Sequence, residues 1–384
     1  MGKIIVLPPT AATLELHLGN LYSWIIADTY CKANQEKGIE VRAIETWNCL
    51  SKKVEDNNPL MTIEQIVEKS SYAIEKARNF FHKYGIKFEQ PGISDLDTDY
   101  IDYVHQKYAE LKKDRTILDN DHMVLPDIAT LKRIAFETTW IPEGSEKRLN
   151  GIYLSSRRVN IFRSGTIGIP HPKREGYVFG QKFVQSHLFD YLNQEHSLEA
   201  GFYGNDLLAR WLFFTIGFTG NLPIRTIGLT GIIQDINGRK ISKYDSNTPR
   251  LEDIKTHPDN VRLSLLKQTL GRDFRQPIFE EENKFRNKLI NTRRFLKHFV
   301  KDGTCEINID KLQKEKDKII DEVLRVRFSE AYRMFYSYVH SISRDLIEPI
   351  KDIGASKVQC YQIVNMLDSI GRVFTPVTIE EQKS

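Results

Sequence analysis

The stretch LELHLGNLYSW, residues 14–24, follows a short apolar run and opens a pattern of apolar residues at helical spacing. The preceding run is Ile4–Leu7, which two prolines stop. Such a run is typical of a strand buried on both faces, as in a parallel sheet. A helix is predicted from Leu18 to about Lys37, with Gly38 ending it. Its apolar face comprises Leu18, Leu21, Tyr22, Ile25 and Ile26.

The segment after this helix, Ile39–Ile44, predicts a second strand, so the chain opens with a strand–helix–strand crossover. In parallel α/β sheets, ligands bind at the carboxyl ends of the strands. His17–Asn20 falls at such an end, where the first turn of a helix presents unpaired N–H groups to a phosphate. Gly19 would let a flat base approach the backbone, and His17 could donate to a phosphate. A capped helix start with a surface histidine is the alternative interpretation.

The bulk composition indicates a globular protein large enough for two or three domains. Its 384 residues are 40% hydrophobic and 28% charged, with a formal net charge of +4, which permits nucleic-acid binding without arguing for it. The early apolar run is too short for a signal peptide or membrane span, so we expect a cytoplasmic protein that does not contact membranes. No zinc knuckle or disulfide framework is indicated by the spacing of Cys31, Cys49, Cys305 and Cys360.

The pattern along the chain predicts four parts. Residues 1–94 form the first half of a parallel α/β sheet, with an amphipathic helix over about 60–90. Residues 95–175 are irregular and turn-rich, as a short connective insertion would be. Residues 176–275 return to α/β character, with a helix around Leu207–Phe218 and a strand over Ile224–Ile233. Residues 276–384 predict an all-α bundle of three or four helices.

A second motif, DINGRKISKYDSN at residues 235–247, follows that strand. Asn237-Gly238 favours a tight turn. Lys240 and Lys243 lie three residues apart with Ser242 between them. Two lysines on such a loop can neutralise the charge that develops as pyrophosphate leaves. A solvated basic loop is the alternative.

Taken together, the two motifs give the chain a resemblance to class I aminoacyl-tRNA synthetases of the isoleucine/leucine/methionine/valine group. LHLGN at 16–20 is similar to the family's HIGH motif, and RKISKY at 239–244 to its KMSKS motif. The stretch TWNCLSKKVE at 46–55 leans towards the methionine enzymes. GFYGNDLLARWLFF, GRDFR, NKFRNKLINTRRFL and TPVTIEE resemble later segments of the family, the last three those of the valine and isoleucine enzymes. The resemblance covers nearly the whole chain.

The resemblance implies a Rossmann-type catalytic fold of the HUP class, split by the insertion, and a helical anticodon-binding-like domain. It also implies a reaction. An amino-acid carboxylate attacks the α-phosphate of Mg²⁺·ATP, giving an aminoacyl-adenylate and pyrophosphate, and the acyl group then passes to tRNA. The matching positions that would hold ATP are Thr10, His17, Gly19, Asn20, Asp206, Lys240, Ser242 and Lys243.

Individual roles follow from the same resemblance. His17 would contact phosphate and stabilise the transition state, while Asn20 replaces the family's second histidine. Lys240 and Lys243 would grip the leaving pyrophosphate. Thr10 is equally well explained as a plain strand end. Asp206 is a candidate for a ribose or amino-acid contact, or alternatively a helix cap.

The amino-acid end of the site departs from the family. Asn48, after Trp47, stands where the family has the aspartate that pairs with the substrate ammonium. An asparagine keeps an acceptor but loses the charge assistance, so we expect weak or altered recognition of the amino group, unless another carboxylate has taken over. Leu50 and Ser51 replace a histidine and a glycine, and Tyr244 replaces the last serine of KMSKS. The insertion is too short for an editing domain, so we predict no proofreading. The cysteines form no cluster of the zinc-knuckle kind, so we predict no metal site within the protein.

Between Lys284 and Lys301 the chain has seven Lys or Arg and no acidic residue. On a helix, Arg286, Arg293 and Lys297 fall on one face with Lys301 close by, which suits contact with a tRNA backbone. A solvated helix face is the alternative.

The leading hypothesis is therefore an aminoacyl-tRNA synthetase-like ligase that uses ATP, an amino acid and tRNA, and nothing in the sequence requires a dimer. One alternative is an adenylate-forming ligase with a non-tRNA acceptor. Another is a catalytically silent tRNA-binding paralogue.

Overall fold

A parallel sheet forms the centre of the computed structural model, which describes residues 2–7, 9–12, 16–57, 60–114, 116–118, 120–204, 206–235, 237–241, 250–298 and 303–382. The strands β10, β9, β1 and β3 lie side by side in that order, and β2 and β4 also pair with β3, all parallel. Their bounds are β1 Gly2–Val6, β2 Thr10–Ala11, β3 Val41–Asn48, β4 Glu89–Ser94, β9 His196–Tyr203 and β10 Ile224–Leu229. This sheet is the predicted Rossmann-type core.

Strand β1 is buried on both faces because its successive side chains enter different hydrophobic cores. Ile5 packs into the core that contains α1 and the helical bundle. Ile4 and Val6 pack into a second core on the opposite face of the sheet. Successive side chains of a strand point to opposite faces, so a continuous apolar run is what a sheet covered on both sides requires.

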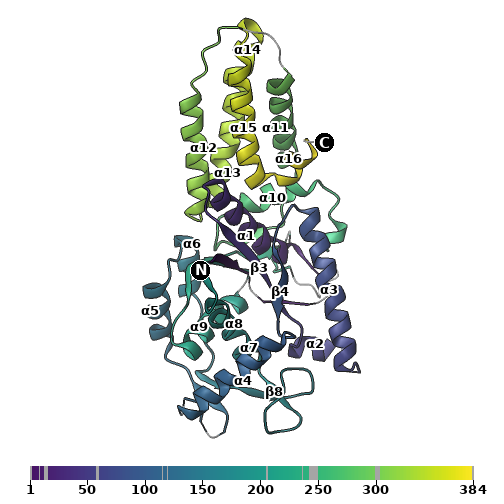
Figure 1. The fold of residues 1–384 in the computed structure, drawn as a ribbon, viewed down its shortest axis with the longest axis vertical. Helices are drawn as coiled ribbons and strands as arrows, with labels where there is room; N and C mark the ends of the chain where they lie inside the picture. Colours follow the sequence, from purple (N-terminus) through teal and green to yellow (C-terminus); the bar gives the residue numbers. More distant parts are fainter. Residues whose placement is uncertain are drawn as a thin grey trace.

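Helices cover both faces of the sheet (Figure 1). One core contains residues of α1 (Leu18–Glu36), α3 (Ile63–Lys83) and α10 (Pro258–Leu266). The other contains residues of α4 (Thr98–Lys113), α7 (Gln181–Ser186), α8 (Leu188–Asn193) and α9 (Asp206–Thr219). The short α2 spans Lys52–Asn57, and the 3₁₀ turn η1 spans Leu251–Asp253.

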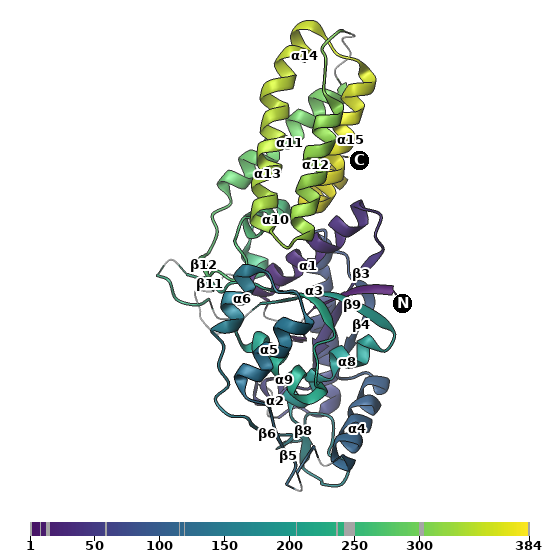
Figure 2. The same ribbon diagram turned by 90° about the vertical axis from the view of Figure 1, so that its left-hand side faces the viewer.

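The region predicted as a connective insertion contains more regular structure than its irregular pattern suggested. Its elements are α4, β5 (His122–Val124), α5 (Ile128–Thr138), α6 (Glu143–Asn150), β6 (Arg158–Asn160) and β7 (Phe162–Ser164). Strand β5 pairs antiparallel with β6, and β7 with β8 (Tyr177–Phe179). These strands lie at the end of the molecule farthest from the bundle (Figure 2).

After β12 (Phe274–Arg275) the described chain is helical, as predicted, and forms an elongated bundle above the sheet (Figures 1 and 2). Its helices are α11 (Glu280–His298), α12 (Ile309–Leu324), α13 (Phe328–Ser341), a π-helical segment η2 (Ile342–Leu346), α14 (Ile347–Ile353), α15 (Lys357–Phe374) and α16 (Pro376–Glu381).

Two predicted strands have different bounds. The strand predicted over Ile224–Ile233 is two: β10 ends at Leu229, and β11 spans Ile233–Gln234 and pairs with β12 (Phe274–Arg275). At Gly231 between them, a Cβ atom would lie 1.6 Å from the carbonyl oxygen of Arg272, so the second segment packs too closely for any side chain there. Strand β3 extends four residues beyond the predicted Ile44 and ends at Asn48.

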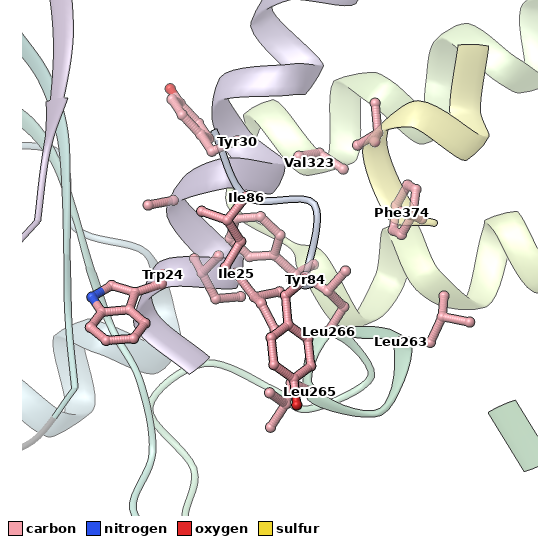
Figure 3. Packing of buried hydrophobic residues seen from close by; sticks show 14 of the residues in the cluster. Trp24, Ile25, Tyr30, Tyr84, Ile86, Leu263, Leu265, Leu266, Val323 and Phe374 are labelled. Carbon is pink, nitrogen blue, oxygen red and sulfur yellow. The ribbon is translucent and has the colours of Figure 1, made fainter. Parts of the chain in front are cut away.

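A buried ion pair joins α1 to α10 where the bundle meets the sheet layer. Arg262 is fully buried, and its Nη2 lies 2.8 Å from Oδ2 of Asp28. The guanidinium also donates to Thr29 Oγ1 and to the carbonyl oxygens of Tyr84 and Val373, the last of these in α15. Figure 3 shows the apolar side chains of α1, α10, α12 and α15 that surround this junction.

Replacing Arg262 by alanine is expected to lower the free energy of unfolding by roughly 3–5 kcal/mol, because the Asp28 carboxylate would stay buried without its partner. Urea denaturation measures the change. Arg133→Ala is the matched control, since Arg133 pairs with Glu137 on an exposed face of α5 and should cost less than about 1 kcal/mol. Equal losses in the two variants would contradict the role given to the buried pair.

Candidate functional site

The start of α1 is closed by a reciprocal pair of hydrogen bonds. His17 is the N-cap residue, and its Nδ1 accepts the N–H of Gly19 at 3.0 Å. In return, Oδ1 of Asn20 accepts the N–H of His17 at 3.3 Å. This is a capping box in which histidine and asparagine take the places usually held by serine or threonine and by glutamate or glutamine. The helix cap, which was the alternative to a nucleotide-binding role, is therefore present. It fixes the orientation of the imidazole.

Gly19 is constrained by the same ring. A Cβ atom at Gly19 would lie 2.8 Å from Cε1 and 2.9 Å from Nδ1 of His17. The missing side chain thus leaves room for the capping imidazole. Another reason for this glycine was expected from the sequence, namely that adenine approaches the backbone there. That approach stays a prediction.

The described residues on the two sides of the lysine motif lie at different places, before it against β11 and after it at the start of α1. Before the loop, Ile241 donates to the carbonyl of Ile233, and Lys240 lies opposite Gln234 in an isolated bridge. After the loop, Arg250 forms an antiparallel bridge with His17, and the N–H of Leu251 donates to the carbonyl of Leu16 at 3.3 Å. Ser242, Lys243 and Tyr244 lie outside the described residues. The described chain thus stops at Ile241, paired with Ile233 of β11, and resumes at Arg250 beside His17.

This terminus lies where the order of the sheet reverses direction. Strand β1 continues through α1 to β3 on one side, and β9 lies on its other side. Gly204, directly after β9, approaches α1 closely: a Cβ there would be 2.9 Å from Oγ of Ser23 and 3.5 Å from the carbonyl oxygen of Gly19. Such a switch point is where open α/β sheets bind ligands. Asp206 begins α9 just beyond, and its side chain lies outside the described residues.

The predicted amino-acid residues lie at the carboxyl end of β3. Trp47 and Asn48 pair with Thr10 and Ala11 of β2, so Thr10 is part of the sheet at this edge. Asn48 is 3% exposed, and its Oδ1 has no hydrogen-bond partner among the described residues; neither has Nε1 of Trp47. Trp47 stacks on Phe81 and meets Trp24 edge-on. An unpartnered buried acceptor beside an aromatic cluster fits a ligand that carries a hydrogen-bond donor.

Sequence reasoning missed two carboxylates in this region, of which Asp95 holds the residues directly after Asn48 and Glu55 binds the connective region. Asp95 accepts the N–H groups of Cys49 and Leu50 at 2.6 and 3.0 Å, and burial raises its pKa to about 6. Glu55 pairs with Arg163 and accepts the N–H of Thr166 at 3.0 Å. Although burial acts to raise the pKa of Glu55, these hydrogen bonds bring it below its usual value. Asp95 had one signal in the sequence, which is its place directly after β4, the strand that pairs with the last part of β3.

The basic stripe predicted on α11 needs a correction. Arg293 is 6% exposed, and its Nε lies 2.5 Å from Oδ1 of Asp368 in α15, so it packs the bundle and is not part of an exposed face. Arg286 is half-buried, Lys297 is exposed, and Lys301 lies outside the described residues. A cavity of about 70 Å³ near the end of α11 is lined by Arg293, Arg294, Lys297, His298, Val364 and Gln382.

The described residues contain neither a metal-ion cluster nor a membrane-spanning helix. Over the described ranges, no cluster of three or more His, Cys, Asp or Glu could hold a metal ion. Among the helices of the described chain, none is long and apolar enough to cross a membrane.

In sequence, the chain is similar to valine–tRNA ligases. The ligase of Parabacteroides distasonis is 27% identical over 220 residues, which cover 49% of this chain and 25% of the ligase. That of Pyrococcus furiosus is 29% identical over 169 residues, which cover 38% of this chain and 19% of the ligase. The aligned part thus spans a quarter or less of these relatives. No family model matches the chain.

In structure, the chain is similar to methionyl-tRNA synthetase from Mycobacterium tuberculosis bound to methionyl-adenylate. The TM-score is 0.72 at 11% identity, over 99% of this chain and 93% of that chain. A second structure of that enzyme with methionyl-adenylate also gives 0.72, at 13% identity.

The chain therefore has the fold of a class I aminoacyl-tRNA synthetase. Within that class, the sequence relatives and the solved structures confirm its resemblance to the valine and methionine enzymes.

The packing of Gly19 against His17 predicts a change of sign in a double-mutant cycle. Gly19→Ala should lower the free energy of unfolding by about 1 kcal/mol, because the new Cβ displaces the capping ring. In a His17→Ala background the same substitution should raise it by about 0.5 kcal/mol, since alanine is the better helix former. Urea denaturation of the four proteins measures both values, and the same sign in both backgrounds would contradict this packing.

Proposed function

We propose that the chain activates an amino acid with ATP and transfers it to tRNA. The observation that carries the proposal is the backbone bridge between His17 and Arg250. It brings the end of the lysine loop to the helix terminus that lies at the switch point of the sheet. The division into a catalytic sheet split by a connective insertion, with a helical tRNA-binding part after residue 276, belongs to the same proposal.

The chemistry is a phosphoryl substitution followed by an acyl transfer. A carboxylate oxygen of the amino acid bonds to the α-phosphorus, and the bond from that phosphorus to the bridging oxygen breaks, so that pyrophosphate leaves with the electron pair. A ribose hydroxyl at the 3′ end of tRNA then attacks the carbonyl carbon, and AMP leaves. Mg²⁺ enters with ATP and shields the charge on its phosphates.

His17 can donate to a phosphate because its cap fixes the tautomer. Nδ1 accepts the N–H of Gly19. A neutral imidazole carries a single proton, which must then lie on Nε2, where it is a donor. The positive end of the helix dipole adds to the attraction for the phosphate. Gly19 and Asn20 serve this site by holding the ring, and Thr10 and Asp206 stay candidates for further contacts with ATP.

Lys240 and Lys243 act on the other end of ATP. Lys240 is exposed at the start of the loop, from which its ammonium can reach the β- and γ-phosphates. With Lys243 and Ser242, it would neutralise the charge that builds up on pyrophosphate as the bond breaks.

The partners follow from the same proposal. Lys297 and Arg294, exposed on α11, with Arg286 and Lys301, would contact the tRNA backbone. We place the protein in the cytoplasm and expect it to act as a monomer. Asn48 lacks the negative charge that would pair with an ammonium, and this favours a second function. That function is the formation of an acyl-adenylate for an acceptor other than tRNA.

Lys240→Ala should lower amino-acid-dependent ATP–pyrophosphate exchange roughly a hundredfold, because one donor to the developing charge is lost. Lys173→Ala, at an exposed position of the connective region, is the matched control and should leave the rate unchanged. An unaltered rate in Lys240→Ala would refute the assignment of the lysine loop. Charging of total tRNA with the same amino acid separates a tRNA acceptor from another one, and exchange in the absence of charging would favour the second function.

Asn48→Asp should lower the KM for the amino acid in pyrophosphate exchange by about tenfold, because a carboxylate pairs more strongly with an ammonium than an amide oxygen does. The KM for ATP should stay unchanged. Asn150→Asp, which adds the same charge at an exposed position at the end of α6, is the control. If the KM for the amino acid does not fall, Asn48 does not face the substrate ammonium.

A further inference from the structure

Asp95 fixes the backbone directly after Asn48. It lies in the turn between β4 and α4, and its side chain is buried. Oδ1 accepts the N–H of Cys49 at 2.6 Å, and Oδ2 accepts that of Leu50 at 3.0 Å. One carboxylate thus holds two successive peptide groups, and both follow the residue whose Oδ1 is buried without a partner.

Burial of a carboxylate at this position costs free energy, because the charge loses its hydration. No lysine or arginine among the described residues forms an ion pair with Asp95. The titratable groups that face it are the Cys49 thiol, the Asp97 carboxylate in its own turn, and the Tyr100 phenol of α4. None of them brings a positive charge. Backbone N–H groups, those of Cys49 and Leu50 first and that of Asp95 itself after them, therefore compensate the carboxylate for its lost hydration.

We propose that Asp95 is a positioning residue for the amino-acid end of the site, which holds Cys49 and Leu50 so that the Asn48 side chain faces the substrate. This inference rests on the proposed function. A hydrogen bond to a charged acceptor is stronger and shorter than one to a neutral acceptor, so the ionised form holds the segment best. Sequence reasoning considered whether another carboxylate replaces the family's aspartate; Asp95 acts instead through Asn48.

Protonation of Asp95 would loosen this segment without unfolding the protein. Burial places its pKa at about 6, above the ordinary 3.8. Because the folded value is the higher one, proton uptake by this group adds to the stability of the fold as the pH falls through 6. The KM for the amino acid should therefore rise below pH 6 with no loss of stability from Asp95, which a merely structural carboxylate would not produce.

The first test follows the amide resonances of Cys49 and Leu50 by NMR as the pH is lowered. In the unmodified protein both should shift with a midpoint near pH 6. Asp95→Asn should abolish the transition. Asp97→Asn is the matched control: its carboxylate accepts the N–H of Ser94 and repels Asp95, so its loss should keep the transition and move it to lower pH. Absence of the transition in the unmodified protein, which needs no variant, overturns the proposal.

The second test measures pyrophosphate exchange. Asp95→Asn should raise the KM for the amino acid by about tenfold to a hundredfold, the value of a charge-assisted hydrogen bond, and leave the KM for ATP unchanged. An unchanged KM for the amino acid in an active Asp95→Asn protein also overturns the proposal. If the unmodified protein shows no exchange, the proposed function fails, and the amide titration alone decides whether Asp95 holds the segment.

Discussion

The buried pair of Asp28 and Arg262 is the interaction on which the arrangement of this molecule depends. Asp28 lies on α1, whose first residues form the candidate site, and Arg262 lies on α10, which follows the segment that returns from the lysine loop. Oδ1 of Asp28 accepts the N–H of Lys87, and Lys32 donates to both Asp28 and the carbonyl of Gly85. A buried ion pair is tolerable when further hydrogen bonds compensate its lost hydration; those to Asp28 and those from Nη1 and Nη2 of Arg262 act in this way. The pair and its hydrogen bonds thus tie α1 to α10 and, through the carbonyl of Val373, to α15.

The candidate site divides into a firmly held part and a variable part. His17, Gly19 and Asn20 hold one another, and Gly204 and Arg250 approach the same helix terminus from distant parts of the chain. This is the part that suits a nucleotide, which is common to all synthetases of the class. The end of β3 is where the chain departs from the family, with a neutral, buried and unpartnered acceptor at Asn48. Under the proposed function, the first part would hold the nucleotide and the second would select the amino acid.

Local pattern predicted the elements whose burial is uniform. The apolar run of β1 and the helical spacing of α1 required no knowledge of distant residues. Strand β3 was predicted too short because Glu45, Thr46 and Asn48 are polar, yet they are buried. Arg78 pairs with Glu45, and Thr46 donates to the carbonyl of Leu7. These partners come from other elements, so no local pattern reveals them.

The same limit applies to the site. The resemblance of the two motifs to the family predicted that His17 and the lysine loop form one site, and this stays a prediction because Lys243 lies outside the described residues. The motifs gave no sign that Asp368, 75 residues along the chain, buries Arg293. Nor did they show that Asp95 holds the residues after Asn48, which depends on the register of β3 against β4.

The most direct measurement is ATP–pyrophosphate exchange by the purified protein, tested with each of the twenty amino acids in turn, with and without tRNA. Exchange that depends on one amino acid or a few related ones is the result that the proposed function predicts. Absence of exchange with every amino acid, in a protein that is folded and binds ATP, would contradict adenylate formation.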